Sequence, residues 1–364
     1  MKYMRPHAIA MITCFAVIVA SVFVGQRICA SRAATTVESS YSDEVSYGTD
    51  PGASIVRAGG TTAYSVDFTG SGHTDPWKTI TRLEADSSKT RWMPFPDVTQ
   101  DARVTGIYVQ RDGTLFCSYY NPHGADSSLT RIARAEYGKS LNVLWATASL
   151  VVRSFAVSEQ GLIYVMGYDP YLEKLSVARD SDLSTTVNSL HIIDPAKNSD
   201  VGLLRATVTK RGLSYFIPLL SEANISVRPN GNFFVTFRPE TAKAGAFASL
   251  LAKDVVELAP DGSTAHVYGL ELNDPDAYVA AVCVDNDASL LVQVVSSTLT
   301  PMQGGYRIKY KDNYLVRVLP TGATLRLPGR LPDGVLVQGW KAHTKSLVLN
   351  ATARHSISMV SVTY

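Results

Sequence analysis

The sequence predicts an all-β fold, most simply a β-propeller of six four-stranded antiparallel sheets arranged in a closed ring. Three observations predict it. A pair of apolar, β-rich runs around a tight turn recurs six times from Ser54 onward, a second such pair follows the first one five times, and the chain ends one strand short of a complete sixth unit. One four-stranded sheet cannot bury both of its faces alone, whereas radial packing between two neighbours covers them.

The first hairpin of each unit joins two half-buried strands through a short polar turn. Glycine suits such turns because it tolerates the positive φ that two-residue hairpin loops demand. The six hairpins are predicted at Ile55–Phe68, Gly106–Tyr119, Phe155–Tyr168, Ile225–Phe237, Val279–Val295 and Val335–Asn350, with turns at Gly59-Gly60, Asp112-Gly113, Gln160-Gly161, Asn230-Gly231, Asn286-Asp287 and His343-Thr344.

A second hairpin follows within each of the first five units. These hairpins are predicted at Ile80–Met93, Leu129–Trp145, Leu190–Leu204, Val255–Tyr268 and Tyr314–Leu327. Arg82, Arg131 and Arg317 occupy the same position of this repeat. We interpret them as structural residues of the third strands, because the stem of a long charged side chain covers apolar surface.

The sixth unit has only three strands of its own, the last at Ser356–Tyr364. An open sheet edge exposes unpaired backbone groups, so a strand from the other end of the chain is expected to pair there. The segment Glu44–Tyr47 is the natural donor, and we predict that it closes the ring. A seven-bladed arrangement follows instead if Gly212–Leu220 belongs to a degenerate extra unit.

The chain divides into a leader, a short connecting segment and one large domain. Residues 1–33 read as a signal peptide or a membrane anchor, residues 34–53 carry the closing strand, and residues 54–364 form a single propeller. Lys2 and Arg5 precede the apolar run Ala8–Gly25, and Ser31-Arg32-Ala33 supplies small residues for cleavage. We therefore expect a secreted or periplasmic protein. The run is also just long enough to span a bilayer, so anchoring by an uncleaved leader remains the alternative.

The net charge of the mature chain excludes nucleic acid as a class of partner. Cleavage near Ala34 removes four of the 34 basic residues and none of the 32 acidic ones, which leaves a net charge of −2. Nucleic acid is excluded as a partner, because its recognition needs a clustered basic surface.

Cys117 and Cys283 fall in the second and fifth units, on opposite sides of a six-unit ring, so we expect two free thiols. We also expect a monomer.

Units that end in an Arg-hydrophobic strand and a Gly turn, such as Arg317-Val318 before Pro320-Thr321-Gly322, resemble those of the NHL, TolB and gluconolactonase-like six-bladed propellers. The resemblance covers nearly all of the mature chain and is architectural. The YWTD, WD and kelch signatures are absent from the sequence. Because propellers host enzymes, sensors and scaffolds alike, the resemblance implies a fold and not an activity.

Connection lengths predict the working face. Loops that join second to third strands, and loops that join one blade to the next, lie on the same face of a propeller. These are long at Asp169–Asn188, Arg238–Lys253, Ser296–Asp312 and Arg205–Glu222, whereas the turns within hairpins are short. Long loops in compact domains are usually functional or disordered, so we expect ligands to bind on this face.

Two groups of candidate ligand-binding residues fall on that face. One combines aromatic rings with a carboxylate, which suits sugar rings or peptide side chains, although the same rings also serve to pack loops onto the blades. The other enters the innermost strands at the channel mouth, where turn formation is the competing explanation. The aromatic group is Trp77, Tyr119, Tyr120, Tyr168, Asp169 and Tyr171, and the channel group is Asp101, Arg153, Asn224, Asp276 and Asp333.

No metal, cofactor or catalytic residue is assigned from the sequence. The gluconolactonase-like resemblance implies Ca²⁺ held by oxygen ligands at the channel mouth, but arginines at the same level repel a cation. No Gly-x-Ser-x-Gly elbow, P-loop or dinucleotide fingerprint occurs. The sequence therefore favours a non-catalytic propeller that binds a glycan or a protein. The alternative is a metal-dependent hydrolase or lyase with its site at the channel mouth.

Overall fold

The structure is a computed structural model, and it confirms the all-β propeller fold. It describes residues 45–48, 54–59, 62–67, 79–83, 89–92, 103–120, 130–168, 188–203, 207–210, 213–216, 224–236, 254–302, 305–341, 345–351 and 356–362. Every regular element within these ranges is a strand. None of the described residues forms a helix long and apolar enough to cross a membrane. The leader of residues 1–33 lies outside the described ranges.

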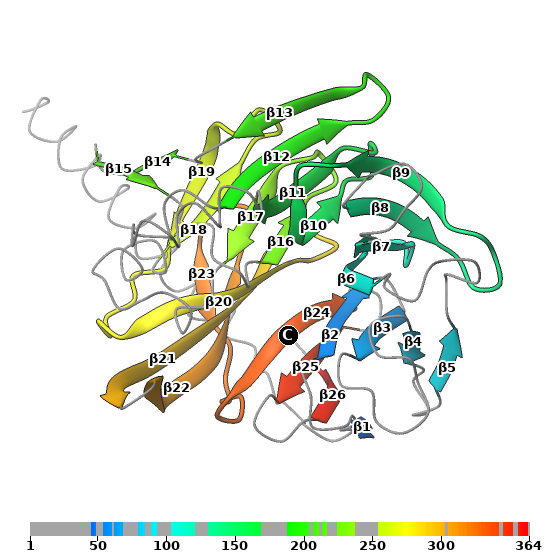
Figure 1. The fold of residues 1–364 in the computed structure, drawn as a ribbon. Coiled ribbons are helices and arrows are strands. Elements are labelled where there is room, and N and C mark those ends of the chain that lie inside the picture. Colours follow the sequence, from blue (N-terminus) through cyan, green and yellow to red (C-terminus); the bar gives the residue numbers. More distant parts are fainter. Residues whose placement is uncertain are drawn as a thin grey trace, which may run out of the picture.

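The described strands form six four-stranded antiparallel sheets and one separate hairpin (Figure 1). The first three sheets are β2 (Ser54–Gly59), β3 (Thr62–Asp67), β4 (Ile80–Leu83) and β5 (Lys89–Trp92); β6 (Arg103–Val109), β7 (Leu115–Tyr120), β8 (Thr130–Ala135) and β9 (Asn142–Thr147); and β10 (Val151–Val157), β11 (Ile163–Tyr168), β12 (Asn188–Asp194) and β13 (Ser199–Leu203).

The remaining sheets complete the ring. They are β16 (Asn224–Val227), β17 (Phe233–Thr236), β18 (Asp254–Leu258) and β19 (Thr264–Gly269); β20 (Ala277–Val284), β21 (Leu290–Met302), β22 (Gly305–Val318) and β23 (Thr324–Arg326); and β24 (Val335–Lys341), β25 (Ser346–Ala351) and β26 (Ser356–Ser361) with β1 (Val45–Gly48). The separate hairpin is β14 (Thr207–Lys210) with β15 (Leu213–Phe216).

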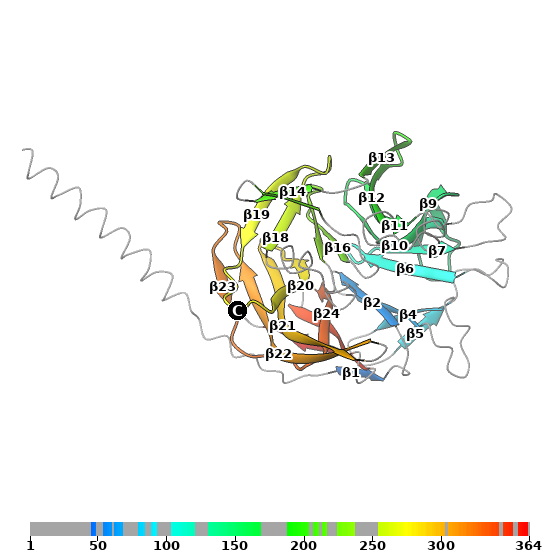
Figure 2. The ribbon, with the colours of Figure 1, turned by 60° about the vertical axis from the view of Figure 1, so that its left-hand side comes forward.

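The first strand of each blade lines the centre. Successive first strands contact one another in the order β2, β6, β10, β16, β20 and β24, and β24 returns to contact β2. Figures 1 and 2 show these strands around the middle and the last strands at the periphery. Because β10 contacts β16 directly, β14 and β15 add no blade between the third and fourth sheets, and β14 lies against β19.

The hairpin turns of the second, third and fourth blades form as the sequence predicts, whereas Gly60 of the first turn and His343-Thr344 of the sixth lie outside the described residues. Gly113, Gly161 and Gly231 take positive φ values of 90°, 83° and 88° in the turns of the second, third and fourth blades. In the fifth blade Ala288 occupies the left-handed position at φ 63°. The fifth hairpin turn therefore lacks the glycine that the turns of the second to fourth blades have at this position.

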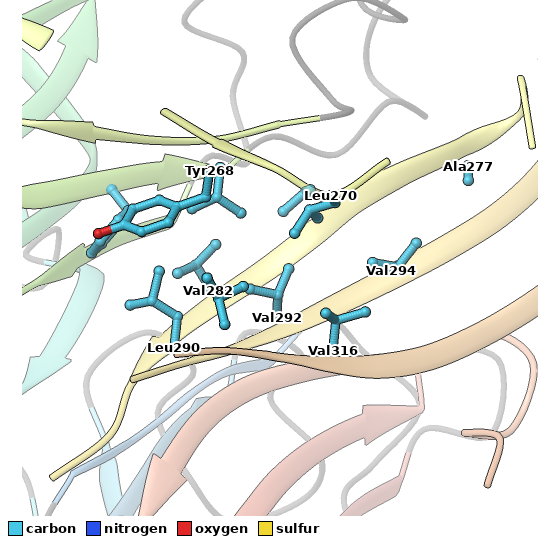
Figure 3. Packing of buried hydrophobic residues seen from close by; sticks show 12 residues of the cluster. Tyr268, Leu270, Ala277, Val282, Leu290, Val292, Val294 and Val316 are labelled. Carbon is cyan, nitrogen blue, oxygen red and sulfur yellow. The ribbon is translucent and has the colours of Figure 1, made fainter. Parts of the chain in front are cut away.

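Adjacent blades bury their apolar faces against each other. One such core joins the fourth and fifth blades, where Tyr268 and Leu270 pack on Val282, Val292 and Val316 (Figure 3). Equivalent cores join the first blade to the second, the second to the third, the third to the fourth and the fifth to the sixth. The second to fifth sheets thus each have an apolar contact on both faces, which one sheet alone lacks.

The closing strand is confirmed. β1 pairs antiparallel with β26, with Val45 opposite Met359 and Gly48 opposite Ser356. The sixth sheet therefore consists of one strand from the start of the propeller and three from its end. Pairing removes the open edge that β26 would otherwise present.

One of the predicted long loops is wrong, because the structure has paired strands there. Ser296–Asp312 is not a long loop, because β21 and β22 continue through it as a ladder that runs to the pair Met302 and Gly305. The long connections at Asp169–Asn188 and Arg238–Lys253 lie outside the described residues, apart from Asn188 at the start of β12. The connection Arg205–Glu222 contains the hairpin β14–β15.

Candidate functional site at the channel mouths

The channel has two mouths, and the sequence-predicted residues belong to the one where the innermost strands begin. Asp276 directly precedes β20, and Asp333 precedes β24 by two residues. Arg153 is the extra residue of a register shift between Val152 and Ser154 in β10, and Asn224 is the first residue of β16. Asp101 lies outside the described residues, as do Trp77, Asp169 and Tyr171.

A β-arm rises beside this mouth. We define the arm as Ser297–Met302 of β21 with Gly305–Lys311 of β22, whose residues pair with each other beyond the last pair with β20, Ala277 opposite Ser296. At its base Tyr310 packs with Tyr278, Val295 and Leu336, all buried. Lys309 and Lys311 on either side of Tyr310 are exposed. At its base, the arm thus has one side against the propeller and one side in solvent.

Ion pairs engage both predicted carboxylates, and one of these pairs ties Asp276 to the arm. Lys311 of the arm pairs with Asp276, and this contact raises the pKa of the Lys311 ammonium. Arg330 Nη2 donates to Asp333 Oδ1 at 2.6 Å, and Arg330 Nε lies 3.6 Å from Asp312 Oδ1. Because Asp312 follows Lys311 in the chain, the network bridges the fifth and sixth blades.

The carboxylates at this mouth are engaged by cations. Asp312 Oδ2 also accepts from Arg326 Nη2 at 2.7 Å, and the Arg326 guanidinium lies 3.7 Å from the centre of the Tyr314 ring. Among the described residues, no group of three or more His, Cys, Asp or Glu side chains is placed to hold a metal ion. The carboxylates Asp276, Asp312 and Asp333 are therefore already paired with cations of the same chain.

The two described members of the aromatic group are both in β7. Tyr119 is 6% exposed in the core between the first and second blades, with the Arg131 guanidinium 5.8 Å from its ring centre. Tyr120 is partly buried at the end of the strand. Tyr168 ends β11. Tyr119 and Tyr120 are consecutive residues of one strand, so their side chains point to opposite faces of the sheet and do not form one aromatic surface.

Sequence reasoning missed a cavity at the opposite mouth. It measures about 120 Å³ and is lined by residues at or directly after the ends of all six innermost strands, among them Arg57, Gln110, Arg228, Cys283 and Gln338. Arg57 Nη1 donates to Gln338 Oε1 at 2.7 Å, and Gln110 Nε2 donates to the carbonyl oxygens of Val157 and Ser158 at 3.1 and 2.8 Å. The signal available in the sequence was a polar residue near the end of five of the six first strands, namely Arg57, Gln110, Ser158, Arg228 and Gln338.

A buried ion pair lies next to this cavity. Arg228 Nε is 3.2 Å from Glu257 Oε1, and the side chains are 10% and 7% exposed. Glu257 also accepts from Asn232 Nδ2 at 2.7 Å and from the Tyr268 hydroxyl at 2.7 Å. Arg228 Nη1 donates to the carbonyl of Ala288 at 2.6 Å. The pair therefore links the fourth blade to the first hairpin turn of the fifth.

Both described cysteines are free, as predicted. Cys117 is fully buried, and burial raises the pKa of its thiol to about 12. Cys283 is partly exposed at the cavity but enclosed by protein, and desolvation raises the pKa of its thiol to about 12 as well. Because the thiolate is the nucleophilic form, neither cysteine is activated near neutral pH.

Comparison with known proteins supports the fold. No family model matches the chain, and no curated protein matches it. A solved gluconolactonase from Xanthomonas campestris is 13% identical, matches over 91% of this chain and 92% of its own, and superposes with a TM-score of 0.50.

Two further solved structures match less well. The calcium-binding protein regucalcin from Agrobacterium tumefaciens is 10% identical over 85% of this chain and 90% of its own, with a TM-score of 0.43. An auxiliary nutrient binding protein from Bacteroides ovatus is 9% identical over 84% of this chain and 67% of its own, with a TM-score of 0.41. The chain thus has a β-propeller architecture similar to that of the gluconolactonase.

Proposed function

We propose that this chain is an exported, non-catalytic propeller that binds a protein or glycan ligand on the face where its innermost strands begin. The arm carries this proposal. β21 and β22 have 13 and 14 residues, whereas the second strands of the other blades have four to six. At about 3.3 Å per residue, the arm extends roughly 20 Å beyond the blade.

The arm has the properties of a preorganised binding element. Tyr310 fixes its base by packing on Tyr278 and Leu336, and the Lys311–Asp276 pair adds a charged contact. A base held in this way lowers the entropy that binding must remove. Within the described residues, the arm strands pair only with each other, so each has an outer edge. Extended peptides bind to such edges by strand addition.

Shortening the arm tests the proposal. Thr298 and Lys309 lie opposite each other, so an Asn-Gly turn in place of Leu299–Ile308 closes the hairpin below them and keeps Tyr310 and Lys311. We expect an unchanged melting temperature together with a loss of at least about tenfold in binding to the peptides or glycans that wild type recognises on arrays.

Two outcomes contradict the proposal. Retention of every array hit by the shortened variant removes the arm from the binding surface. A Ca²⁺-dependent thermal shift that disappears in Asp276→Ala/Asp333→Ala, accompanied by turnover of a lactone or ester, supports the metal-dependent hydrolase instead.

Mass spectrometry of the exported protein tests the proposed export, since cleavage of the leader near Ala34 is expected.

A further inference from the structure

One side chain crosses the channel at the mouth where the innermost strands end. Arg111 lies two residues after the end of β6 in the second blade, and Asn286 lies two residues after the end of β20 in the fifth. Arg111 Nε donates to Asn286 Oδ1 at 2.9 Å, and Arg111 Nη2 donates to the Asn286 carbonyl oxygen at 3.4 Å. The second and fifth blades are opposite each other in a ring of six, so this contact spans the mouth. We call the Arg111 side chain with its two hydrogen bonds the strap.

The cavity at this mouth lies at the strap. Arg111 belongs to its lining, together with residues from the ends of all six innermost strands. The volume of about 120 Å³ has room for a small molecule, since a cavity of about 150 Å³ accommodates benzene. Of the two described cysteines, Cys283 lines the cavity and Cys117 does not.

The turns at both ends of the strap are held by the same kind of contact. In each turn an aspartate accepts from the backbone N–H two residues further on, Asp112 from Thr114 at 2.8 Å and Asp287 from Ser289 at 3.0 Å. Such contacts fix the backbone of a turn. The Arg111 side chain is therefore the part of this bridge that is free to rotate.

Neighbouring blades close the wall of the cavity. Arg57 of the first blade donates to Gln338 of the sixth at 2.7 Å, and Trp340 Nε1 of the sixth donates to Asp285 Oδ1 beside the fifth at 3.1 Å. Because adjacent blades are tied side by side here, the approach to the cavity from this face runs along the channel axis, past Arg111.

The strap is weak compared with the sheets that it joins. Asn286 is exposed and Arg111 is partly exposed, so water competes for both hydrogen bonds. Rotation of an exposed side chain is fast and requires no change in the backbone. The contact can therefore break and form again while the ring stays folded.

We propose that the strap closes this cavity and opens to admit small uncharged molecules. In the closed state Arg111 lies across the mouth, and in the open state its side chain extends into solvent. The strap acts at the opposite end of the channel from the arm, so it does not depend on the proposed function of the arm. Cys283 reports the state of the strap, because its thiol lies at the cavity.

Alkylation of Cys283 by iodoacetamide tests the proposal. Peptide mass spectrometry follows Cys283 and Cys117 together in the full chain. We expect Arg111→Ala to speed alkylation of Cys283 about three- to tenfold, the range set by one or two surface hydrogen bonds. Alkylation of Cys117 and the melting temperature should not change. Asn286→Ala should have a smaller effect, because the backbone carbonyl still accepts from Arg111.

The charge change in Arg111→Ala does not mimic this result. Only the thiolate is alkylated, and a nearby cation lowers the pKa of a thiol. Removal of the Arg111 guanidinium therefore favours the protonated thiol and slows the reaction at Cys283. Faster alkylation in Arg111→Ala thus reports access to the cavity.

The matched control is Gln160→Ala. Gln160 donates to the Pro229 carbonyl, a contact between neighbouring turns on the same face, and it is not part of the cavity lining. Its removal should leave the alkylation rate of Cys283 unchanged. The shortened-arm variant should also react at the wild-type rate, which separates this result from the test of the arm.

Two results overturn the proposal. Equal rates at Cys283 in wild type and Arg111→Ala show that the strap does not limit access. Equal acceleration at Cys117 in Arg111→Ala, or at Cys283 in Gln160→Ala, shows a general loosening of the fold in place of an opened mouth.

Discussion

At the scale of single residues, a buried ion pair between Arg228 and Glu257 lies beside the cavity at the mouth where the innermost strands end. Arg228 and Glu257 are 9% and 5% exposed, and the carboxylate of Glu257 also accepts from Asn232 and Tyr268. Removal of charges from water is costly, and the added hydrogen bonds offset that cost. The arrangement tolerates the pair only as long as both partners are present.

Glu257→Leu should therefore destabilise the propeller strongly. The substitution leaves Arg228 buried without its counterion, for which we expect a loss of about 3–5 kcal/mol in the free energy of unfolding. Urea denaturation measures the change. Arg228→Met/Glu257→Leu should recover much of the loss, and Glu136→Gln, in an exposed ion pair, should have little effect. An unchanged urea midpoint in Glu257→Leu contradicts this account.

At the scale of elements, the innermost strands approach each other too closely for side chains at two positions. A Cβ atom at Gly59 of β2 would lie 2.1 Å from the carbonyl oxygen of Gln110, which follows β6. A Cβ atom at Gly339 of β24 would lie 2.6 Å from the backbone nitrogen of Ala58. The strands around the channel are therefore packed backbone against backbone at these places, which only glycine permits.

Gly59→Ala should separate β2 from β6. The backbone of Gln110 cannot rotate away like a side chain, so we expect overpacking to cost about 1–3 kcal/mol, seen as a lower melting temperature. Gly269→Ala is the matched control, because its Cβ would have 4.0 Å to the nearest atom, Asp254 Oδ1. Equal melting temperatures for the two variants would show that the inner strands are not in tight contact.

At the scale of the whole molecule, the ring depends on the pairing of its two ends. β1 supplies the fourth strand of the sixth sheet, and β24 of that sheet contacts β2 of the first. The closing strand therefore completes a sheet whose first strand belongs to the central ring. Loss of β1 exposes the edge of β26 and removes the constraint that joins the chain ends.

Deletion of Asp43–Gly48 should lower the melting temperature sharply. The deletion removes all four residue pairs between β1 and β26. Differential scanning calorimetry measures the effect, and Ser46→Pro provides a milder version because proline removes one backbone donor from the segment. If the deleted chain melts at the wild-type temperature, the closing strand does not hold the ring together.

Local pattern was sufficient to predict most of the strands. Alternation and turn residues placed the hairpin Gly106–Tyr119 with its Asp112-Gly113 turn, and Gly113 takes the positive φ that this turn requires. The closing segment was predictable because an incomplete last unit leaves an edge that must be paired. The arm was not predictable, since Pro301 and Gly304 within Ser296–Asp312 favour a loop and ladder pairing overrides them.

The fold class and the ring closure follow from the amino-acid sequence alone, because strand period, turn chemistry and an incomplete last repeat can be read along the chain. The same pattern predicts that Asp276 and Asp333 lie on one face. The partners of these two carboxylates and the cavity at the opposite mouth depend instead on how the blades pack in three dimensions. Blade packing brings Lys311 to Asp276 and Arg330 to Asp333, and strand register aligns Tyr64, Arg82 and Thr90. Such contacts cannot be read from the sequence, because no repeating pattern of residues marks them.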